Sequence, residues 1–278
     1  MLIDLHTHST CSDGTLTPED LIDFAAENHI EVIALTDHDT TAGLKQFISS
    51  AALYNITAVP GIELSAEWKA GHCHFVGLNL ESDNKELEDI LAKIRSGRNI
   101  RNKEILSRLD QLGYPITIDQ VKRFACGEVV ARPHIARALV EAGYVNTLQD
   151  AFDRFLEKGA AAYVERFRLQ PDDAVRALKA AGATVVLAHP DQLRISDEEM
   201  KSFISDLVAS GLDGIEAYTY NCTDDRICLL AKMAEDLGLK VSGGSDFHGE
   251  NKPERKLGYY RDGLPVPESV LDMIRHNS

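Results

Sequence analysis

The amino-acid sequence predicts an α/β protein in which parallel strands, joined by helical crossovers, close into a barrel. Short apolar stretches of strand length alternate with helical patterns, and this alternation is typical of a parallel sheet. Most of the unusual polar residues stand at or just after the ends of the predicted strands. They come from both ends of the chain, which favours a closed barrel over an open doubly wound sheet, because these residues must converge on one site.

The first part of the chain supplies four predicted strands and two helices. A helix begins after Thr17, which can cap it, and Pro18 suits the first helical position. A second helix ends near Tyr54. The strands are expected at Leu2–Leu5, Glu31–Leu35, Thr57–Leu64 and His72–Leu78.

The last part of the chain repeats the alternation. Gly182 and Gly238 stand where a glycine that ends a helix belongs. The predicted strands are Thr184–Leu187, Gly214–Tyr218 and Lys240–Ser242. The predicted helices are Pro171–Ala181, Asp197–Ala209 and Asp224–Leu237.

Residues 82–167 break the alternation, because no strand pattern is found there. Apolar residues recur at helical spacing instead, as in Leu87, Ile90, Leu91 and Ile94. We therefore predict that residues 1–97 and 167–278 form the barrel. Residues 98–166 are expected to form a helical insertion that caps the active site.

Composition and charge exclude several classes of protein. The 278 residues include 44% hydrophobic and 26% charged residues, as in ordinary globular proteins. The formal net charge of −15 argues against binding to duplex DNA, where basic residues supply most of the affinity. There is no apolar run long enough to span a membrane and no secretory signal pattern, so we expect a cytoplasmic protein. The five cysteines, at positions 11, 73, 126, 222 and 228, are expected to be free thiols.

Histidines and carboxylates gather at the predicted strand ends. His6 and His8 are two residues apart, so on a strand both rings face one side and can reach one ion. An HxH pair alone is weak support, because short motifs arise often by chance. The whole set is stronger support, because it includes six of the ten histidines. Its nine members are His6, His8, Asp13, His38, Glu63, His74, His189, Asp246 and His248. Imidazole and carboxylate ligands suit Zn, Mn or Fe. His29, His72 and His276 are assigned to surface or local structural roles.

These residues resemble the PHP (polymerase and histidinol phosphatase) family of metal-dependent phosphoesterases. The similarity lies in His6-Thr-His8 with Asp13, in Thr36-Asp37-His38, in Glu63, His74 and the His189-Pro190 step, and in Ser245-Asp246-Phe247-His248. The strings SDGTLTPEDLI and ALTDHDTTAGL are similar to a small bacterial subgroup that includes nucleoside 3′,5′-bisphosphate phosphatases and 5′-3′ exoribonucleases. The resemblance covers essentially the whole chain.

The resemblance implies a distorted seven-stranded (β/α)7 barrel and a centre of up to three divalent ions. Manganese is the expected metal, with Zn, Fe and Mg as alternatives. Carried over residue by residue, it gives three ligand sets: His6, His8, Glu63 and Asp246; Glu63, His74 and His189; and Asp13, His38 and His248. Glu63 would bridge the first two ions, and a hydroxide shared between metals would attack the phosphorus.

Residues beyond the ligands carry further predictions. Asp37 and Asp39 are candidates to orient the histidine rings, with capping of the following helix as the alternative for Asp39. Arg132 and His134 are candidates to bind substrate phosphate. Arg98 and Arg101 are expected on a solvated helix face. The glycines of Ser242-Gly-Gly-Ser245 are expected to let the backbone approach the metal site.

The function implied by the resemblance is hydrolysis of the 3′-phosphate of nucleoside 3′,5′-bisphosphates, together with 5′-3′ degradation of short RNA. The alternatives are a histidinol-phosphate or other small-metabolite phosphatase, a metal-binding regulatory domain without catalysis, and a proofreading module of a polymerase. The complete ligand set argues against the second alternative, and the short chain argues against the third.

Overall fold

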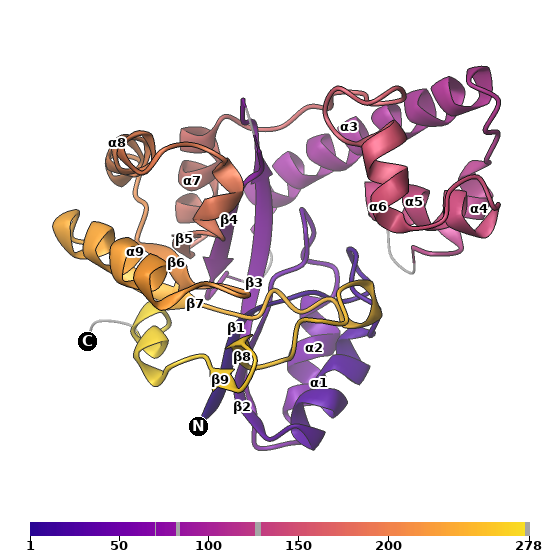
Figure 1. The fold of residues 1–278 in the computed structure, drawn as a ribbon. Coiled ribbons are helices and arrows are strands. Elements are labelled where there is room, and N and C mark those ends of the chain that lie inside the picture. Colours follow the sequence, from indigo (N-terminus) through magenta and orange to yellow (C-terminus); the bar gives the residue numbers. More distant parts are fainter. Residues whose placement is uncertain (70, 82–83, 126–128, 276–278) are drawn as a thin grey trace.

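A seven-stranded sheet, with helices packed on it, forms most of the molecule (Figure 1). The computed structural model describes residues 1–69, 71–81, 84–125 and 129–275. Cys126 and His276, for which the sequence predicts a free thiol and a surface position, lie outside the described residues. The strands follow each other in chain order: β1 (Leu2–Thr7), β2 (Ile30–Leu35), β3 (Thr57–Ala66), β4 (Cys73–Leu78), β5 (Thr184–Leu187), β6 (Gly214–Tyr218) and β7 (Lys240–Gly243).

The two edges of the sheet meet at one end. Thr7, the last residue of β1, forms a parallel bridge with Phe247, which follows β7. The His8 N–H donates to the Phe247 carbonyl oxygen at 2.9 Å. The first and last strands are therefore neighbours where they end, so the predicted convergence of both chain ends is confirmed.

The expectation that all strands are parallel is wrong for β4. This strand runs antiparallel to both β3 and β5. Only residues 67–72 connect β3 to β4, and a parallel crossover needs a dozen residues or more. The other neighbouring pairs within the sheet are parallel.

Helices lie along the chain between the strands. Helix α1 (Pro18–Glu27) begins as predicted, because Thr17 accepts a hydrogen bond from the Asp20 N–H and Pro18 occupies the first position. The other helices of the alternating part are α2 (Leu44–Ala51), α7 (Pro171–Ala180), α8 (Asp197–Val208) and α9 (Asp224–Asp236). Short 3-10 helices follow at Pro190–Leu193, Gly249–Asn251 and Glu268–Met273. The strands β8 (Tyr259–Arg261) and β9 (Leu264–Pro265), which the sequence did not indicate, form a short hairpin.

The segment between β4 and α7 is helical wherever it has regular structure among its described residues. It contains α3 (Lys85–Gln111), α4 (Ile118–Lys122), α5 (Arg132–Glu141), α6 (Leu148–Ala151) and a turn of π-helix at Phe152–Leu156. Helix α3 starts beside the sheet and runs away from it, and α4–α6 gather around its far half (Figure 1). This far half has its own apolar core, which includes Ile105, Leu109, Val121, Ile135 and Leu139. The division of the chain at residue 98 stays a prediction, and that residue lies inside α3.

The interior of the sheet is apolar at one end and polar at the other. Val59 of β3 and Val76 of β4 pack in an apolar cluster with Ile3, Leu5 and Val186. On the same strand faces, at even spacing, stand Glu63 and His74. The candidate ligands therefore lie next to this apolar cluster, at the other end of the same strand faces.

Within the described residues, no helix is both long and apolar enough to cross a membrane. Cys73, Cys222 and Cys228 are free thiols, as predicted.

Candidate metal centre

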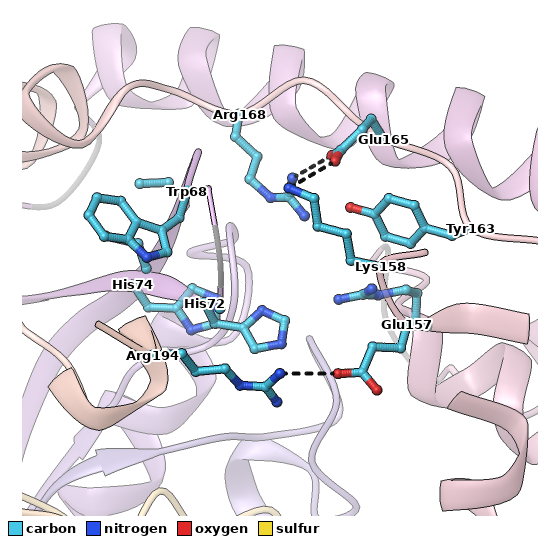
Figure 2. A pocket seen from close by; sticks show the side chains of 13 residues that line it. Trp68, His72, His74, Glu157, Lys158, Tyr163, Glu165, Arg168 and Arg194 are labelled. Carbon is cyan, nitrogen blue, oxygen red and sulfur yellow. Dashed lines mark hydrogen bonds and ion pairs between the residues drawn. The ribbon is translucent and has the colours of Figure 1, made fainter. Parts of the chain in front are cut away.

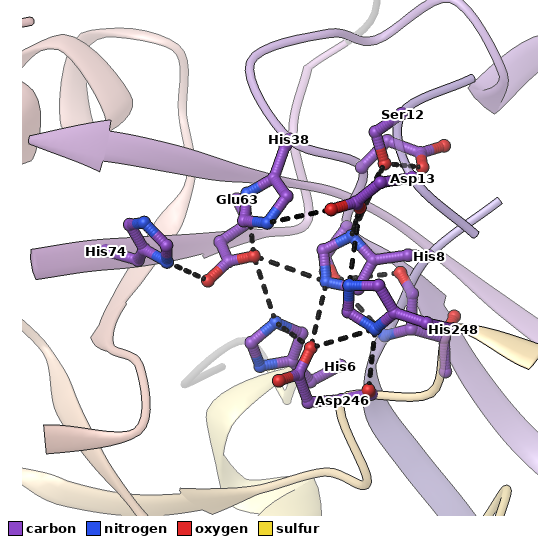
Figure 3. Close-up of polar contacts among 12 residues, drawn as sticks. His6, His8, Ser12, Asp13, His38, Glu63, His74, Asp246 and His248 are labelled. Atoms are coloured by element: carbon purple, nitrogen blue, oxygen red, sulfur yellow. Dashed lines mark hydrogen bonds and ion pairs between the residues drawn. The ribbon is translucent and has the colours of Figure 1, made fainter. Parts of the chain in front are cut away.

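The structure brings the nine candidate ligands together at the end of the sheet where its edges meet (Figure 3). Strand β2 continues past Leu35 as an irregular segment that pairs with β3. In this pairing the Glu63 N–H donates to the Asp37 carbonyl oxygen at 3.2 Å, and the Asp39 N–H donates to the Glu63 carbonyl oxygen at 3.0 Å. His38 is thereby held beside Glu63.

Glu63 stands at the centre of the cluster, and its side chain is fully buried. Its Oε1 lies 2.8 Å from His74 Nδ1 and 2.8 Å from His189 Nε2. Its Oε2 faces three further rings, with His38 Nδ1 at 2.9 Å, His8 Nε2 at 3.2 Å and His6 Nε2 at 3.4 Å. Each carboxylate oxygen therefore serves a separate group of imidazoles, which is the arrangement that a bridging ligand requires.

Three sets of ligand atoms lie close enough to hold an ion. They are His6, His8, Glu63 and Asp246; His8, Asp13, His38 and His248; and His38, Glu63 and His74. The first set equals the one that the resemblance implied, and the second adds His8. In the third, His38 stands where His189 was expected, although His189 also contacts Glu63. The assignment of individual ligands to individual ions stays a prediction.

Unpartnered polar atoms show that the site fits cations. Within the described residues, six buried atoms of the cluster have no hydrogen-bond partner: His6 Nε2, His8 Nε2, His38 Nδ1, His74 Nδ1, His189 Nδ1 and Glu63 Oε2. Leaving so many buried polar atoms unsatisfied costs about 1–3 kcal/mol each. Divalent ions would satisfy all of them at once, since neutral imidazole and carboxylate are their usual ligands.

Comparisons with known proteins agree with this geometry. Residues 4–180 match the model of the PHP domain. The chain belongs to the PHP domain family.

Named relatives of this PHP chain act on nucleotides or RNA. It is 36% identical over 88% of its length to a 5′-3′ exoribonuclease of Haemophilus influenzae, of which it covers 89%. It is 35% identical over 95% of its length to a 3′,5′-nucleoside bisphosphate phosphatase of Chromobacterium violaceum, of which it covers 93%. A crystal structure from Bifidobacterium adolescentis, assigned to the metal-dependent phosphoesterases, superposes with a TM-score of 0.86 at 31% identity, covering 98% of this chain and 95% of the other.

Hydrogen bonds fix the tautomers of two rings in this PHP site. His6 Nδ1 lies 3.0 Å from Glu216 Oε1, and His248 Nδ1 lies 2.8 Å from the Asp246 carbonyl oxygen. A carbonyl oxygen only accepts, so the His248 Nδ1 must carry the proton. The Nε2 atom of His6 is then left with its lone pair directed at the cluster, as metal ligation needs, whereas His248 Nε2 lies 3.2 Å from Lys252 Nζ.

The cluster holds its carboxylates ionised. Burial alone raises the pKa of Glu63, but His38, His74 and His6 outweigh it and bring that pKa well below its usual range. Burial likewise opposes the lowering of the Asp246 pKa, which Lys252, Arg255 and nearby histidines cause. At neutral pH both residues therefore offer negatively charged oxygens to a cation.

The backbone is strained at two of the candidate ligands. His189 has a φ of 28° and Asp246 a φ of 52°, where residues with a side chain are rare. Such conformations persist only when the surroundings enforce them, and they gather at functional sites.

The two aspartates predicted to orient rings lie near the cluster, and that role stays a prediction. Asp37 accepts hydrogen bonds from the Ser9 N–H and from the hydroxyls of Ser9 and Ser12, and Ser12 Oγ lies 3.5 Å from His8 Nδ1. Asp39 instead accepts from the Ser65 N–H at 2.9 Å and pairs with Arg98 and Arg166. Capping by Asp39 is wrong, since helix α2 has Gly43 as its N-cap and no side-chain cap bond.

The structure corrects the expectation for Arg98 and Arg101. Both side chains are buried, with residue exposures of 6% and 3%, so neither forms a solvated face. Helical spacing predicted the helix that carries these residues, but the carboxylate that pairs with Arg98 is that of Asp39, in the segment after β2. A pattern within one helix cannot reveal a partner so distant in sequence.

The sequence patterns did not indicate two buried carboxylates that hold candidate ligands in place. Asp4 accepts from the N–H groups of His6, Ser245 and Gly258 and from the Ser245 hydroxyl, and burial raises its pKa to about 6. Glu216 accepts from His6 and, at 2.7 Å, from the His189 N–H. The available signal was a carboxylate within an otherwise apolar strand, as in LIDL and GIEAY.

A pocket rich in cations adjoins the cluster at His74 (Figure 2). Its lining includes His72, Arg132, Lys158, Tyr163, Arg168 and Arg194. Arg132 is the predicted phosphate ligand, and it is held by a hydrogen bond from Nη1 to the Leu156 carbonyl oxygen at 3.0 Å. Within the described residues no carboxylate forms an ion pair with it, whereas Arg168 pairs with Glu67 and Glu165 and Arg194 pairs with Glu157.

His134, the other predicted substrate ligand, has a structural role. It is buried, and its Nδ1 accepts the Ala131 N–H at 3.1 Å at the start of α5. A direct contact of His134 with substrate stays a prediction. His29 and His72 are exposed, as expected, but His72 also lines the cationic pocket.

Proposed function

We propose that the protein is a divalent-metal-dependent phosphatase that removes the 3′-phosphate from nucleoside 3′,5′-bisphosphates, such as adenosine 3′,5′-bisphosphate. We propose the same hydrolysis, in the 5′-3′ direction, for short RNA with a 5′-phosphate. Manganese is the proposed metal, with up to three ions per chain, and the cytoplasm is the proposed location. Relatives of about 35% identity over nearly the whole chain, with these activities in their names, support the proposal.

The observation that carries the proposal is the pairing of the ligand cluster with a separate cationic pocket. The cluster would take the phosphate under attack, and the second phosphate of a bisphosphate would need cationic partners of its own. Arg132 shares the lining of this pocket with Lys158, Arg168 and Arg194, and burial together with the nearby Arg168 lowers the pKa of Arg132. A phosphate would relieve this repulsion, and Arg offers it paired donors.

The roles of the chain's own residues follow from this placement. Glu63, with one oxygen toward each group of imidazoles, keeps the ligand sets at a fixed separation. Glu216 holds His6 in the tautomer that leaves Nε2 free to ligate. Arg132 and Arg168 would hold the 5′-phosphate and so set which phosphate reaches the cluster. Bound divalent ions would acidify a water molecule as the nucleophile and stabilise the charge on the phosphoryl oxygens.

A substrate screen tests the proposal. Purified protein is supplied with Mn²⁺ and given adenosine 3′,5′-bisphosphate, adenosine 3′-phosphate, adenosine 5′-phosphate or histidinol phosphate, and inorganic phosphate is measured. We expect the bisphosphate to have the highest kcat/KM, with adenosine 5′-phosphate accumulating as the product. Preference for histidinol phosphate would favour a metabolite phosphatase instead. No release from any substrate by metal-loaded protein would favour a regulatory domain.

A further inference from the structure

A second pocket also adjoins the ligand cluster, but it is lined by other ligands of the cluster than the cationic pocket is. It is lined by His189 and Asp246 of the cluster, and by the chain after β6 and the segment after β7, including Tyr220, Asn221, Thr223 and Arg255. Its volume of about 340 Å³ lies within the range of small-molecule sites. A molecule bound there would touch the metal centre without entering the cationic pocket.

The chemistry of this second pocket differs from that of the cationic pocket. The positive charge of Arg226 is balanced by Asp191 and Asp197, which leaves amide, hydroxyl and aromatic groups to face a ligand. Tyr220 is half-buried, and the Arg255 guanidinium carbon lies 5.1 Å from the centre of its ring. An aromatic ring beside hydrogen-bonding side chains suits a nucleobase with its ribose, because every base can stack.

Arg255 independently supports a ligand in this pocket, because one of its buried hydrogen-bond donors is unsatisfied. Its side chain is largely buried and pairs through Nη1 with Asp246. Its Nε is buried and has no hydrogen-bond partner within the described residues, because Glu254 Oε1, with which it forms an ion pair, lies 3.9 Å away and is too distant for a hydrogen bond. A buried donor without a partner is costly, and an oxygen of a nucleotide in this pocket would satisfy it.

We propose that this pocket holds the second nucleoside of an RNA chain that carries a 5′-phosphate. The inference rests on the proposed function and extends it to the part of the substrate beyond the attacked phosphate. The first nucleoside has its 5′-phosphate in the cationic pocket, and its 3′-phosphate lies on the cluster. The next nucleoside, esterified to that same phosphate, then occupies the pocket at Tyr220.

With this placement the two proposed activities are the same reaction, because the same bond to phosphorus is broken in both substrates. A water oxygen adds to the phosphorus, the bond to the 3′-oxygen of the first nucleoside breaks, and that oxygen takes up a proton. With a bisphosphate the phosphorus leaves as inorganic phosphate and the second pocket is not used. With RNA the phosphate stays on the 5′-oxygen of the second nucleoside, so the shortened chain again begins with a 5′-phosphate.

The test compares adenosine 3′,5′-bisphosphate with the 5′-phosphorylated dinucleotide pApA. The measured quantity is the ratio of kcat/KM for pApA to kcat/KM for the bisphosphate. Because stacking of one base contributes about 1–3 kcal/mol, we expect Tyr220→Ala to lower this ratio about tenfold, mainly through KM. Tyr220→Phe keeps the ring and should keep the ratio. Tyr54→Ala, at an exposed tyrosine remote from both pockets, is the control.

Tyr220 also contacts Arg255, so its loss could disturb Asp246 and slow both substrates. Asn221→Ala and Thr223→Ala, at exposed positions of the same pocket, provide a second set, and a lowered ratio is again expected. An unchanged ratio in all three alanine variants would overturn the inference. Hydrolysis of the bisphosphate without hydrolysis of pApA would also overturn it but leave the proposed function intact. Failure on both substrates would reject the proposed function itself.

Discussion

Glu216 holds two candidate metal ligands in place without belonging to any of the three ligand sets. Its two carboxylate oxygens accept from His6 Nδ1 and from the His189 N–H, so it orients two candidate ligands from different strands. Replacement by glutamine puts an NH₂ group where one of these donors needs an acceptor. The ring of His6 is then free to turn or to change tautomer.

We therefore predict that Glu216→Gln weakens metal binding by about 10–100-fold, the usual effect of losing such a partner. The measurement is competition with a chelator of known affinity. Glu199→Gln, at an exposed position in α8, is the matched control and should bind metal normally. Equal affinities in the two variants would show that Glu216 does not support His6.

Replacing Arg132 tests whether this residue binds the phosphate that is not attacked. Arg132→Ala should lower kcat/KM for adenosine 3′,5′-bisphosphate by about 10–100-fold, because a hydrogen bond to a charged group contributes about 1.5–3 kcal/mol. Adenosine 3′-phosphate lacks the second phosphate and should lose far less. Since remote binding energy can act in the transition state, kcat can fall together with the rise in KM.

The control for Arg132 is Arg123→Ala, which removes an exposed arginine of the same helical segment. Equal losses on both substrates would contradict the assignment and would place Arg132 at the reacting phosphate or in the fold.

At this scale the sequence indicated which residues gather in the cluster, but it did not indicate most of their hydrogen-bond partners. HxH spacing, and histidines after apolar strands, mark ligands because strand periodicity and strand ends are local features. The partners Asp4 and Glu216 depend on neighbours more than two hundred residues away, for example Asp4 with Ser245 and His6 with Glu216. The buried pairing of Arg98 with Asp39 was missed for the same reason.

At the scale of elements, strands β1 and β7 approach so closely that a side chain would not fit between them. A Cβ atom placed on Gly244 would lie 2.6 Å from the His6 backbone nitrogen and would also clash with the His6 side chain. The glycine is therefore required by the backbone approach that brings Asp246 toward His6, as the sequence predicted for this string.

We predict that Gly244→Ala destabilises the fold by about 1–3 kcal/mol, the usual cost of overpacking, and also weakens metal binding. Urea unfolding and chelator competition measure the two effects. Gly113→Ala is the control, because Gly113 has a φ of +85° but open space around it, so only backbone strain is introduced. Normal metal binding by Gly244→Ala would mean that β7 can shift without moving its ligands.

A second link between elements joins α3 to the end of β2. Asp39 is fully buried and pairs with Arg98 of α3 and with Arg166. Burial opposes ionisation of Asp39, but the two arginines lower its pKa below the usual range. Removing the carboxylate leaves two buried cations, whereas removing Arg98 leaves one arginine to pair with Asp39.

Asp39→Asn should therefore lower the free energy of unfolding by about 3 kcal/mol or more, and Arg98→Met by less. Urea denaturation of the two variants in the presence of a chelator measures this without a contribution from metal binding. A larger loss in Arg98→Met would contradict the pairing, because Arg166 could not then be a partner of Asp39.

At the scale of the whole molecule, the class of fold followed from the sequence but one strand direction did not. Alternation of apolar runs and helical patterns suffices for an α/β sheet, whereas the direction of β4 depends on the short connection after β3. The place of the helical segment relative to the sheet also could not be read from periodicity. It is set by long-range contacts such as Arg98–Asp39 and the hydrogen bond from Lys158 to the Lys69 carbonyl oxygen.

We propose that one buried carboxylate, Glu63, holds together a metal centre that performs phosphate ester hydrolysis. The most direct test is to count the divalent ions bound per chain by elemental analysis in the wild type and in Glu63→Gln, with turnover of adenosine 3′,5′-bisphosphate measured on the same samples. We predict that the variant loses more than one ion and that kcat falls about a hundredfold or more. A variant with a full complement of ions and near-wild-type turnover would contradict this account.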